Sequence, residues 1–466
     1  MIPVVTPEEM AEIDKAAPEP VEVLIERAGG AVARAAVELL GGTYGRRVLV
    51  VAGRGNNGAD GRAAARRLER LGVRVEVIEA TDAAQAAGTA TPRRRADLVI
   101  DAAYGTGFRG EYEAPDPGGA PVLAVDIPSG VNGLTGEASD GAVRAARTVT
   151  FAALKPGLLL GAGRSLAGRV DVIDIGLDVS EARASYVGWP DVATWLPDRP
   201  AESHKWKSAL WIVAGSPGMA GAAHMCARAA MRAGAGTVRL GIPGSPPDPG
   251  WLEVVGRETP KAGWDRFVLE DSERAKALVV GPGLARSDET RVCTRRLAAA
   301  APQALVLDAD GLYALGQNRH AHAIIADRRA PTLLTPHEGE FRRLSGSPVG
   351  ADRLASARDL ASATGATVLL KGSTTVVADP GGHAIFSTAG DSRLATAGTG
   401  DVLSGVAGAF LAQGLDALRA GAAAAFVHGA AGHLGWRRGL VAGDLLDLLP
   451  AVLNQPPDSE AVRRVP

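Results

Sequence analysis

The sequence predicts an α/β protein with two successive domains, each built around a parallel sheet. Three observations support this prediction. Short apolar runs alternate with helical segments along the chain, as expected of parallel strands whose sheet is covered on both faces. A stretch rich in proline and charged residues, 191–207, interrupts the series and indicates a linker. The length of 466 residues is sufficient for two or three domains.

The first series of elements begins with a helix. Thr6 suits the N-cap, Pro7 suits the first helical position, and Glu9 is placed to bond back to the cap. A glycine-rich turn and a helix through Leu71 follow the first strand. The expected strands of this series are 48–52, 73–78, 97–101, 122–127, 149–152 and 170–175.

A second series begins at Leu210, in the run LWIVAGS, and ends with helices after Asp401 and around 423–433. We therefore expect a first domain with its linker at 1–197 and a second domain at 198–466. Further strands of the second domain are expected at 236–241, 277–280, 304–308, 332–335 and 368–371.

Composition narrows the class of protein. Hydrophobic residues make up 46% and charged residues 22% of the chain, so each domain can bury an ordinary core. The formal net charge of -2 argues against a general nucleic-acid binder. Cys226 and Cys293 are far apart and form neither a disulfide framework nor a metal pattern. Because no signal peptide or membrane-spanning run is evident, we expect a cytoplasmic protein with no membrane partner.

Three strand ends in the first half carry polar residues beside glycines. The turn 53–61 contains G-x-G-x-x-G between a strand and a helix, which is one signature of a dinucleotide site. Its Asn and Asp side chains also suit a ribose, a phosphate or a hard cation, or a simple Asx turn. Asp101 precedes the loop 104–110, and Asp126 precedes 128–132. Since ligands bind beyond the carboxyl ends of parallel strands, these ends point to one crevice.

The stretch Thr396–Gly405 predicts an anion site in the second half. Its small residues expose backbone amides at the start of an apolar helix, where a phosphate can bind. Asp401 would repel that phosphate, unless it removes a proton from a hydroxyl that attacks it. Asp401 can equally be a first-turn acid that stabilises the helix, and this stretch leaves both interpretations open.

Other strand ends of the second half also carry polar or glycine-rich turns. Lys371 leaves a strand beside three hydroxyl residues, a set that suits phosphate but is less specific than a Walker loop. His337 lies in a loop with two acids and, on its own, is most simply a structural turn residue. The remaining turns are 215–222, 280–284 and 305–310.

The first half resembles the NAD(P)HX epimerase family over about residues 1–180. The resemblance rests on the loops GRGNNGADG, VIDAAYGTGFRG and VDIPSGVNGLTG, and it implies a Rossmann-like three-layer fold. It implies a potassium site at Asn57, Asp101 and Ser129, and inversion at carbon 6 of a hydrated nicotinamide ring. Asp126 is the expected acid/base group, or else holds a ribose hydroxyl. Ala59 stands where the family usually has glycine. The implied contacts to the hydrated cofactor are Asn56, Asn57, Gly58, Ala59, Asp60, Gly105, Thr106, Gly107, Phe108, Arg109, Gly110, Glu111 and Asp126.

The second half, from about His204, resembles the ribokinase-like NAD(P)H-hydrate dehydratase domain of the same bifunctional proteins. GSPGMAGA, GPGL, LDADGL, TPHEGE, LKGSTT and AGTGDVLSG occur in the family order. The resemblance implies substrate contacts at Ala222, Gly283, His337 and Asp401. It implies adenine-nucleotide contacts at Lys371, Gly372, Ser373, Thr374, Thr375 and Gly400, and a magnesium position at Glu340. Departures from the family pattern are Ala285, Asp391–Arg393 and Ala397.

Together these resemblances imply a metabolite-repair enzyme. Its first domain would interconvert the R and S hydrates of NADH and NADPH, and its second would dehydrate the S form with ADP, releasing AMP and phosphate. ADP, Mg²⁺ and K⁺ are the implied cofactors, and a homo-oligomer is the expected assembly. A ribokinase-like small-molecule kinase with a regulatory nucleotide-binding domain is the alternative. A non-catalytic cofactor sensor is a third interpretation, against which the carboxylate of Asp401 argues.

Overall fold

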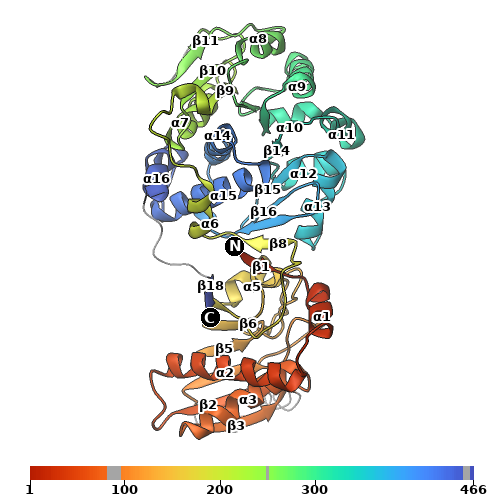
Figure 1. The fold of residues 1–466 in the computed structure, drawn as a ribbon, viewed down its shortest axis with the longest axis vertical. Coiled ribbons are helices and arrows are strands. Elements are labelled where there is room, and N and C mark those ends of the chain that lie inside the picture. The colour runs from red at the N-terminus through yellow and green to blue at the C-terminus, as the bar shows by residue number, and fades with distance from the viewer. Residues whose placement is uncertain (81–95, 248–250, 455–461, 466) are drawn as a thin grey trace. The chain divides into compact units, whose positions relative to one another are not determined.

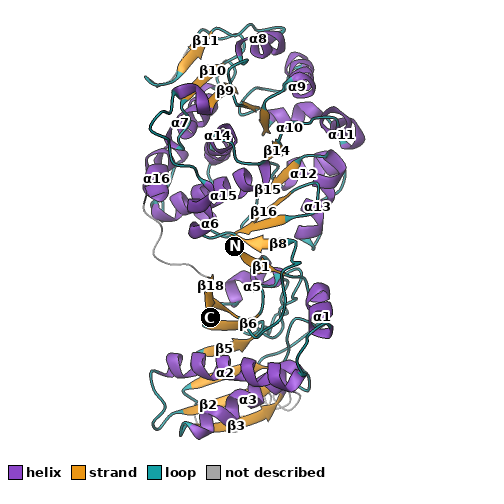
Figure 2. Ribbon diagram, in the orientation of Figure 1, coloured by secondary structure: helices purple, strands orange, loops and turns teal. Residues whose placement is uncertain are grey.

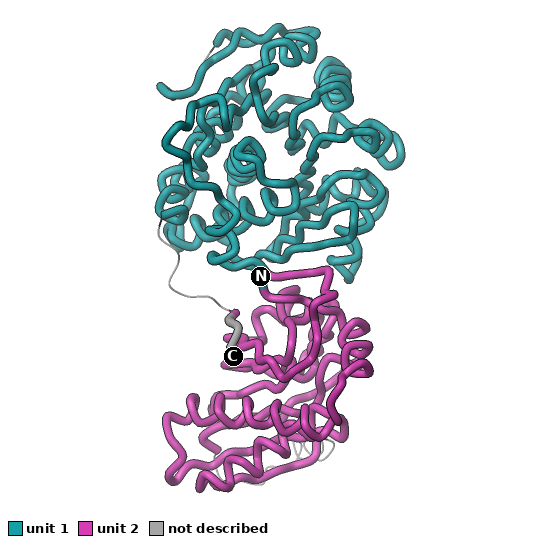
Figure 3. The backbone as a smooth tube through the Cα atoms, viewed as in Figure 1, with its two compact units in different colours: residues 1, 187–458 teal, residues 2–186, 459–466 magenta. Residues whose placement is uncertain are grey.

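The computed structural model describes residues 1–80, 96–247, 251–454 and 462–465 (Figure 1). The chain divides into two compact units (Figure 3). The N-terminal unit comprises residues 2–186 together with the last described strand, and the C-terminal unit begins at Val187. In the described residues, no helix combines the length and apolar character needed to cross a membrane.

The unit boundary follows Tyr186, although we expected a domain boundary between residues 197 and 198. The stretch expected to be a linker contains helix α6 (Trp189–Trp195) and the 3₁₀ turn η2 (Lys205–Ser208). Val192 of α6 is buried in the core of the C-terminal unit, and the ring of Trp189 lies 6.4 Å from that of Phe426. The prolines of the stretch, Pro197 and Pro200, lie between α6 and η2, in a segment without helix or strand.

A parallel seven-stranded sheet forms the centre of the N-terminal unit, in the order β18-β7-β6-β5-β4-β2-β3 (Figure 2). The strand β18 comes from the other end of the sequence and pairs in parallel with β7, which the sequence analysis did not predict. A short antiparallel pair joins β1 (Ile2–Val4) to β8 (Ala184–Tyr186). The strands of the sheet are β2 (Arg47–Ala52), β3 (Arg74–Glu79), β4 (Leu98–Ala102), β5 (Val122–Val125), β6 (Arg147–Phe151), β7 (Arg169–Ile173) and β18 (Val462–Val465).

Helices α2 (Val21–Leu40) and α3 (Asn56–Arg70) pack on one face of this sheet. They approach closely, because a β-carbon at Gly29 would lie 2.5 Å from that of Ala63. On the other face, valines of β2, β4 and β5 pack against Tyr112 and Val143 from connecting loops. Shorter segments are α1 (Pro7–Lys15), which begins with the predicted capping box, η1 (Pro156–Leu158) and α5 (Gly161–Leu166).

The C-terminal unit contains a larger sheet in the order β17-β16-β15-β14-β13-β12-β9-β10-β11. It is parallel from β15 to β11, which confirms the prediction for this part. The antiparallel pairs β15–β16 and β16–β17 were not predicted. The strands are β9 (Ala209–Val213), β10 (Thr237–Gly241), β11 (Val255–Arg257), β12 (Ala277–Val280), β13 (Ala304–Leu307), β14 (Thr332–Leu334), β15 (Thr367–Leu370), β16 (Thr375–Ala378) and β17 (Ala384–Ser387).

Helices cover both faces of the parallel part of this sheet, as predicted (Figure 2). One face carries α7 (Ala220–Arg232), α14 (Thr399–Ala412), α15 (Ala417–Leu434) and α16 (Ala442–Asn454). The other carries α8 (Trp264–Asp271), α9 (Asp288–Ala300), α10 (Asp310–Leu315), α11 (Asn318–Ala326), α12 (Glu338–Ser345) and α13 (Arg353–Thr364). Glycines bring α14 close to its neighbours: a β-carbon at Gly405 would lie 2.1 Å from the Cys226 carbonyl oxygen, and one at Gly408 would lie 2.3 Å from Val279.

Candidate active sites

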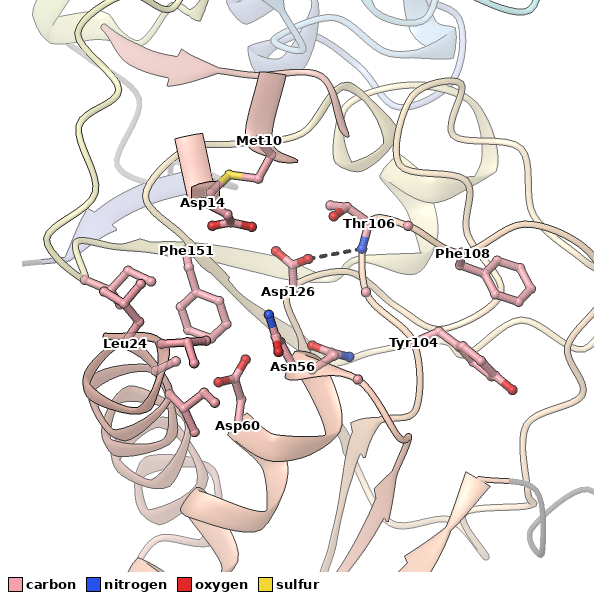
Figure 4. A pocket seen from close by; sticks show the side chains of 18 of the residues that line it. Met10, Asp14, Leu24, Asn56, Asp60, Tyr104, Thr106, Phe108, Asp126 and Phe151 are labelled. Carbon is pink, nitrogen blue, oxygen red and sulfur yellow. Dashed lines mark hydrogen bonds between the residues drawn. The ribbon is translucent and has the colours of Figure 1, made fainter. Parts of the chain in front are cut away.

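A cavity of about 930 Å³ lies at the carboxyl ends of the strands of the N-terminal unit (Figure 4). Of the residues predicted to bind a cofactor there, Gly58, Ala59 and Gly110 do not line it. Gly58 instead shapes the turn, because a β-carbon there would lie 1.9 Å from the Gly53 carbonyl oxygen. Those that line the cavity are Asn56, Asn57, Asp60, Gly105, Thr106, Gly107, Phe108, Arg109, Glu111 and Asp126.

Asp126 follows β5 directly and has a left-handed conformation, with φ of 67°. This backbone ends the strand at Val125, and the Asp126 side chain points into the cavity. Its Oδ1 accepts hydrogen bonds from Lys155 Nζ at 2.7 Å and from Thr150 Oγ1 at 3.1 Å. Its Oδ2 accepts one from the Thr106 amide at 3.2 Å. The Asp126 side chain is 14% exposed and Lys155 is 1% exposed. The ammonium of Lys155 is thus the direct counter-charge of the Asp126 carboxylate.

Among the charged residues of this cavity that sequence reasoning missed are Lys155 and Asp14. Lys155 donates to Asp126 and Thr150, and also to the Phe151 carbonyl at 3.1 Å. The available signal was a single lysine within an apolar run directly after a strand. Asp14 lies on α1, and burial raises the pKa of its carboxyl, with a smaller opposite effect from the charge of Lys155. Nothing in the sequence of α1 indicates that this acid faces the ligand cavity.

Of the residues of the predicted potassium site, Asp101 and Ser129 are in direct contact, and Asn57 lines the cavity. Asp101 is 1% exposed and accepts hydrogen bonds from the Ser129 amide at 2.8 Å and hydroxyl at 2.6 Å. Burial raises the pKa of Asp101 to about 6, against the lowering effect of these hydrogen bonds. Both polar atoms of the Asn57 side chain are buried without a partner among the described residues. A β-carbon at Gly105 would lie 3.1 Å from Asp126 Oδ2, so glycine there leaves room for that carboxylate.

In the C-terminal unit, α14 begins at Thr399, two residues before Asp401, whereas we expected the helix after Asp401. The N-cap is Gly398, with φ of 91°, and no side chain caps the first amides. This left-handed backbone favours glycine, whereas a β-carbon there would meet the flexible end of the Met225 side chain at 2.6 Å. Asp401 therefore lies in the first turn, beside uncapped amides that carry the positive end of the helix dipole.

Buried charges lie next to Asp401 at the carboxyl end of β13. The carboxylate of Asp308 accepts hydrogen bonds from Lys371 Nζ at 2.8 Å and from the buried Ser404 hydroxyl at 2.7 Å. Lys371 Nζ also lies 3.9 Å from Glu340. Burial, followed by the charge of Asp308, raises the pKa of Asp401 to about 6. Burial likewise raises the pKa of the Glu340 carboxyl.

The residues predicted to contact the adenine nucleotide occupy different surroundings. Lys371 belongs to the charged cluster just described, near Gly400, where a β-carbon would lie 3.8 Å from its Nζ. Gly372 lies against the Arg353 guanidinium, and Thr374 is buried. Ser373 precedes it in the same turn, and Thr375 begins β16.

The remaining predicted substrate residues are placed by two different elements. His337 is the N-cap of α12: its Nδ1 accepts hydrogen bonds from the Gly339 and Glu340 amides, and its side chain is 60% exposed. A structural capping role thus accounts for its position. Ala222 and Gly283 lie in contact, because a β-carbon at Gly283 would be 2.9 Å from that of Ala222.

Two departures from the family pattern can be interpreted structurally: Arg393 forms stabilising hydrogen bonds, and Ala285 has a strained backbone. Arg393 pairs with Asp391 and donates to the carbonyls of His433 and Gly435, so it ties this loop to the end of α15. Ala285 has a φ of 61°, a region that disfavours any residue with a β-carbon. The family's preference for glycine at this position therefore has a backbone reason.

Replacing Ala285 by glycine is expected to raise the free energy of unfolding by about 1 kcal/mol, because it removes left-handed strain. Chemical denaturation of the purified protein measures the change. Ala397→Gly is the matched control: it also restores a family glycine, but Ala397 is not among the described residues with positive φ. It should bring no gain. Equal effects of the two substitutions would contradict the assigned cause.

Comparison with known proteins agrees with this architecture. Residues 210–452 match the family model described as NAD(P)H-hydrate dehydratase, and residues 21–93 and 79–157 match the one described as YjeF-related protein N-terminus. The C-terminal unit has a ribokinase-like fold. It is similar to a ribokinase-like superfamily protein from Enterococcus faecalis, with a TM-score of 0.51 and 22% identity, covering 58% of this chain and 96% of that one.

Curated relatives extend the similarity over both units. The bifunctional NAD(P)H-hydrate repair enzyme Nnr of Mycobacterium tuberculosis is 40% identical over 404 residues, which is 82% of either chain. That of Mycobacterium leprae is 39% identical over 451 residues, covering 91% of this chain and 92% of that one. The chain belongs to the family of bifunctional NAD(P)H-hydrate repair enzymes, and the resemblance noted from its loops is confirmed.

Proposed function

We propose that the N-terminal unit interconverts the R and S hydrates of NADH and NADPH, and that the C-terminal unit dehydrates the S hydrate at the expense of ADP, releasing AMP and phosphate. Family membership across both units favours this function over a small-molecule kinase with a regulatory domain. The observation that carries it is the position of Asp401, a half-buried acid in the first turn of a helix whose amides are uncapped.

The dehydration begins with transfer of the β-phosphate of ADP to the ring hydroxyl. Asp401 takes the hydroxyl proton as the new oxygen–phosphorus bond forms and the bond to AMP breaks. Amides at Gly398–Gly400 hold the transferring phosphate, and the ammonium of Lys371 adds positive charge nearby. Phosphate then leaves carbon 6, a proton leaves carbon 5, and the ring double bond is restored.

Glu340 is the residue that would hold magnesium in the C-terminal unit. Nucleotide-bound Mg²⁺ is usually held by one or two carboxylates together with phosphate oxygens, so a single acid beside the phosphate position fits. Glu340 is 16% exposed and lies 3.9 Å from Lys371 Nζ, which also donates to Asp308. The ion would neutralise charge on the phosphates.

In the N-terminal unit, Asp126 moves the proton required for inversion at carbon 6. Its carboxylate faces the cavity, and Lys155, Thr150 and the Thr106 amide fix its orientation. The alternative role of Asp126, holding a ribose hydroxyl, would not require a buried lysine directly behind the carboxylate.

Potassium fits the cluster of Asn57, Asp101 and Ser129. Asp101 is buried without an ion pair among the described residues, and Asn57 offers an unpartnered buried oxygen. A buried carboxylate without a cation is costly, and amide, hydroxyl and carboxylate oxygens suit a hard ion. These residues would hold K⁺, which would offset the charge of Asp101 and brace the loop after β4.

Potassium is expected to stabilise the protein against thermal unfolding relative to choline at equal ionic strength. At a concentration one hundred times the dissociation constant, the gain is about 2.7 kcal/mol. Asp101→Asn should remove the potassium-dependent part, because it removes the charge that the ion compensates. Calorimetry in the two salts measures both proteins, and equal melting of the natural protein in potassium and choline would contradict the assignment.

The dehydration rate is expected to fall as pH is lowered through about 6. Asp401 acts as a base only when ionised, and its pKa is raised to about 6 by burial and by Asp308. The value of kcat/KM should fall tenfold per pH unit below this point and stay level above it. Because the folded pKa exceeds the unfolded one, ionisation of Asp401 lowers stability as pH rises between about 4 and 6. A level rate down to pH 4.5 would contradict the base role.

One experiment tests the proposed function as a whole. The protein is incubated with a mixture of R and S hydrates and with ADP, ATP or no nucleotide, and NADH absorbance is followed. Recovery of both epimers with ADP supports two working sites. Recovery of the S fraction alone, beyond spontaneous epimerisation, shows an inactive N-terminal unit. A stable phosphorylated product without NADH would favour the kinase alternative.

A further inference from the structure

Three aspartates face the cavity of the N-terminal unit: Asp14 on α1, Asp60 on α3 and Asp126 after β5 (Figure 4). One buried ammonium, that of Lys155, is available to them, and it is hydrogen-bonded to Asp126 at 2.7 Å. Three like charges around one cavity with one buried counter-charge repel one another, so their ionisation is unequal. In the described residues, Asp126 is the member with a direct counter-charge.

Asp60 is the member least able to bear a charge. It is 8% exposed, and its carboxyl makes no hydrogen bond or ion pair within the part of the chain that the structure describes. Figure 4 shows its side chain beside Leu24 and Phe151, two apolar residues of the same cavity. Burial, followed by the charges of Asp126 and Asp14, raises the pKa of Asp60 to about 8. At neutral pH it therefore carries a proton.

The charged groups on the elements around α3 are compensated elsewhere. Glu26 of α2 pairs with Arg66 and Arg67, and Arg62 pairs with Glu79 of β3. Asp101 at the end of β4 is bonded to Ser129, and Lys15 of α1 is bonded to Glu12. Arg54 and Arg109 line the cavity with exposed side chains. In the described residues, the proton of Asp60 is thus set by burial and by its two aspartate neighbours.

We infer that Asp60 is the general acid and Asp126 the general base of the epimerisation, an inference that rests on the proposed function. In the hydrate, carbon 6 carries a hydroxyl and is bonded to the ring nitrogen. Asp126 takes the hydroxyl proton, the bond from carbon 6 to nitrogen breaks to leave an aldehyde, and Asp60 gives its proton to that nitrogen. Closure on the opposite face of the aldehyde reverses both transfers and yields the other epimer, with no change in oxidation or net proton count.

Asp60→Asn tests this role, because asparagine keeps the shape and a hydrogen-bond donor but cannot transfer a proton. The kcat of epimerisation, followed by separating R and S hydrates and subtracting spontaneous conversion, should fall about 10²–10⁴-fold, with a small change in KM. In the natural protein the rate should also fall above pH 8, as Asp60 loses its proton. That limb should be absent from the residual activity of the variant.

Asp14→Asn is the matched control, since it removes another carboxyl from the same cavity. The rate of this variant should still fall at high pH, but the fall should begin at a lower pH. One of the two carboxylates that raise the pKa of Asp60 is gone. Dehydration of the pure S hydrate by each variant verifies that the protein is folded. An Asp60→Asn variant with unchanged kcat, or one that keeps the high-pH limb, would overturn the inference.

A readout independent of turnover separates this inference from the proposed function. The infrared difference spectrum between the natural protein and Asp60→Asn should contain a protonated-carboxyl band at pH 7 that disappears above pH 8. Its absence overturns the acid role even if the protein epimerises. If the band is present but the natural protein does not speed epimerisation, the proposed activity of this unit fails, and the role of Asp60 fails with it.

Discussion

Asp401→Asn is expected to lower kcat for dehydration of the S hydrate by about 10²–10⁴-fold while ADP still binds. The reason is geometric: Asp401 lies in the first turn of α14, where a transferring phosphate meets the uncapped amides, and no other group in that turn can accept a proton. Loss of a carboxylate also removes repulsion of the phosphate, so nucleotide affinity should be equal or higher. Stopped assays for AMP and calorimetric titration with ADP measure the two quantities.

Asp310→Asn provides the control for loss of charge alone. Asp310 contributes to the raised pKa of Asp401, yet its carboxyl is bonded to the Ala285 amide and to Arg286. This variant should retain the acid limb of the pH profile, shifted to lower pH. Unchanged turnover of Asp401→Asn with intact ADP binding would leave Asp401 as a helix-stabilising acid only.

Asp126→Asn is expected to abolish epimerisation and to leave dehydration of the S hydrate intact. Asparagine matches the carboxylate in size but accepts no proton, and it leaves the buried ammonium of Lys155 without a counter-charge. Leaving such a charge unpaired typically costs about 3–5 kcal/mol, so the N-terminal unit should also unfold more easily. Supplying the R hydrate alone, with ADP, isolates the epimerase step.

Lys155→Met separates catalysis from stability at this position. It removes the ammonium and leaves Asp126 buried, so it should lower stability by a similar mechanism but keep a group able to accept a proton. Partial epimerase activity is therefore expected from Lys155→Met at low temperature, and none from Asp126→Asn. Persistent epimerisation by Asp126→Asn would show that another residue moves the proton.

Most of the fold prediction rested on local sequence patterns. The capping box at Thr6 and the buried apolar runs mark their elements because a few neighbouring residues determine them. The strand that begins at Val122 ends at Val125, earlier than expected. The left-handed backbone of Asp126 ends it, and the residue type does not reveal this conformation. β18 was missed because its pairing with β7 depends on residues far apart in sequence.

The site was predictable to the same extent. Asp401 directly follows Gly400, and Asp126 lies at a strand end shortly before Gly130, so their sequence context is informative. Lys155 and Asp308 act through contacts made across the fold, and Asp14 reaches the cavity from a helix with no motif of its own. Pairings of this kind have no fixed spacing in the chain, so only the structure brings them together.

The pairing of β18 with β7 has a consequence for how the chain can be divided. Because residues on both sides of the C-terminal unit contribute to one sheet, that unit is an insertion within the N-terminal one. A fragment that stops at Tyr186 would leave the β7 edge unpaired, and an open edge strand invites association with other chains. Separate expression of the epimerase half therefore calls for a circularly permuted gene, in which the last strand is joined ahead of the first.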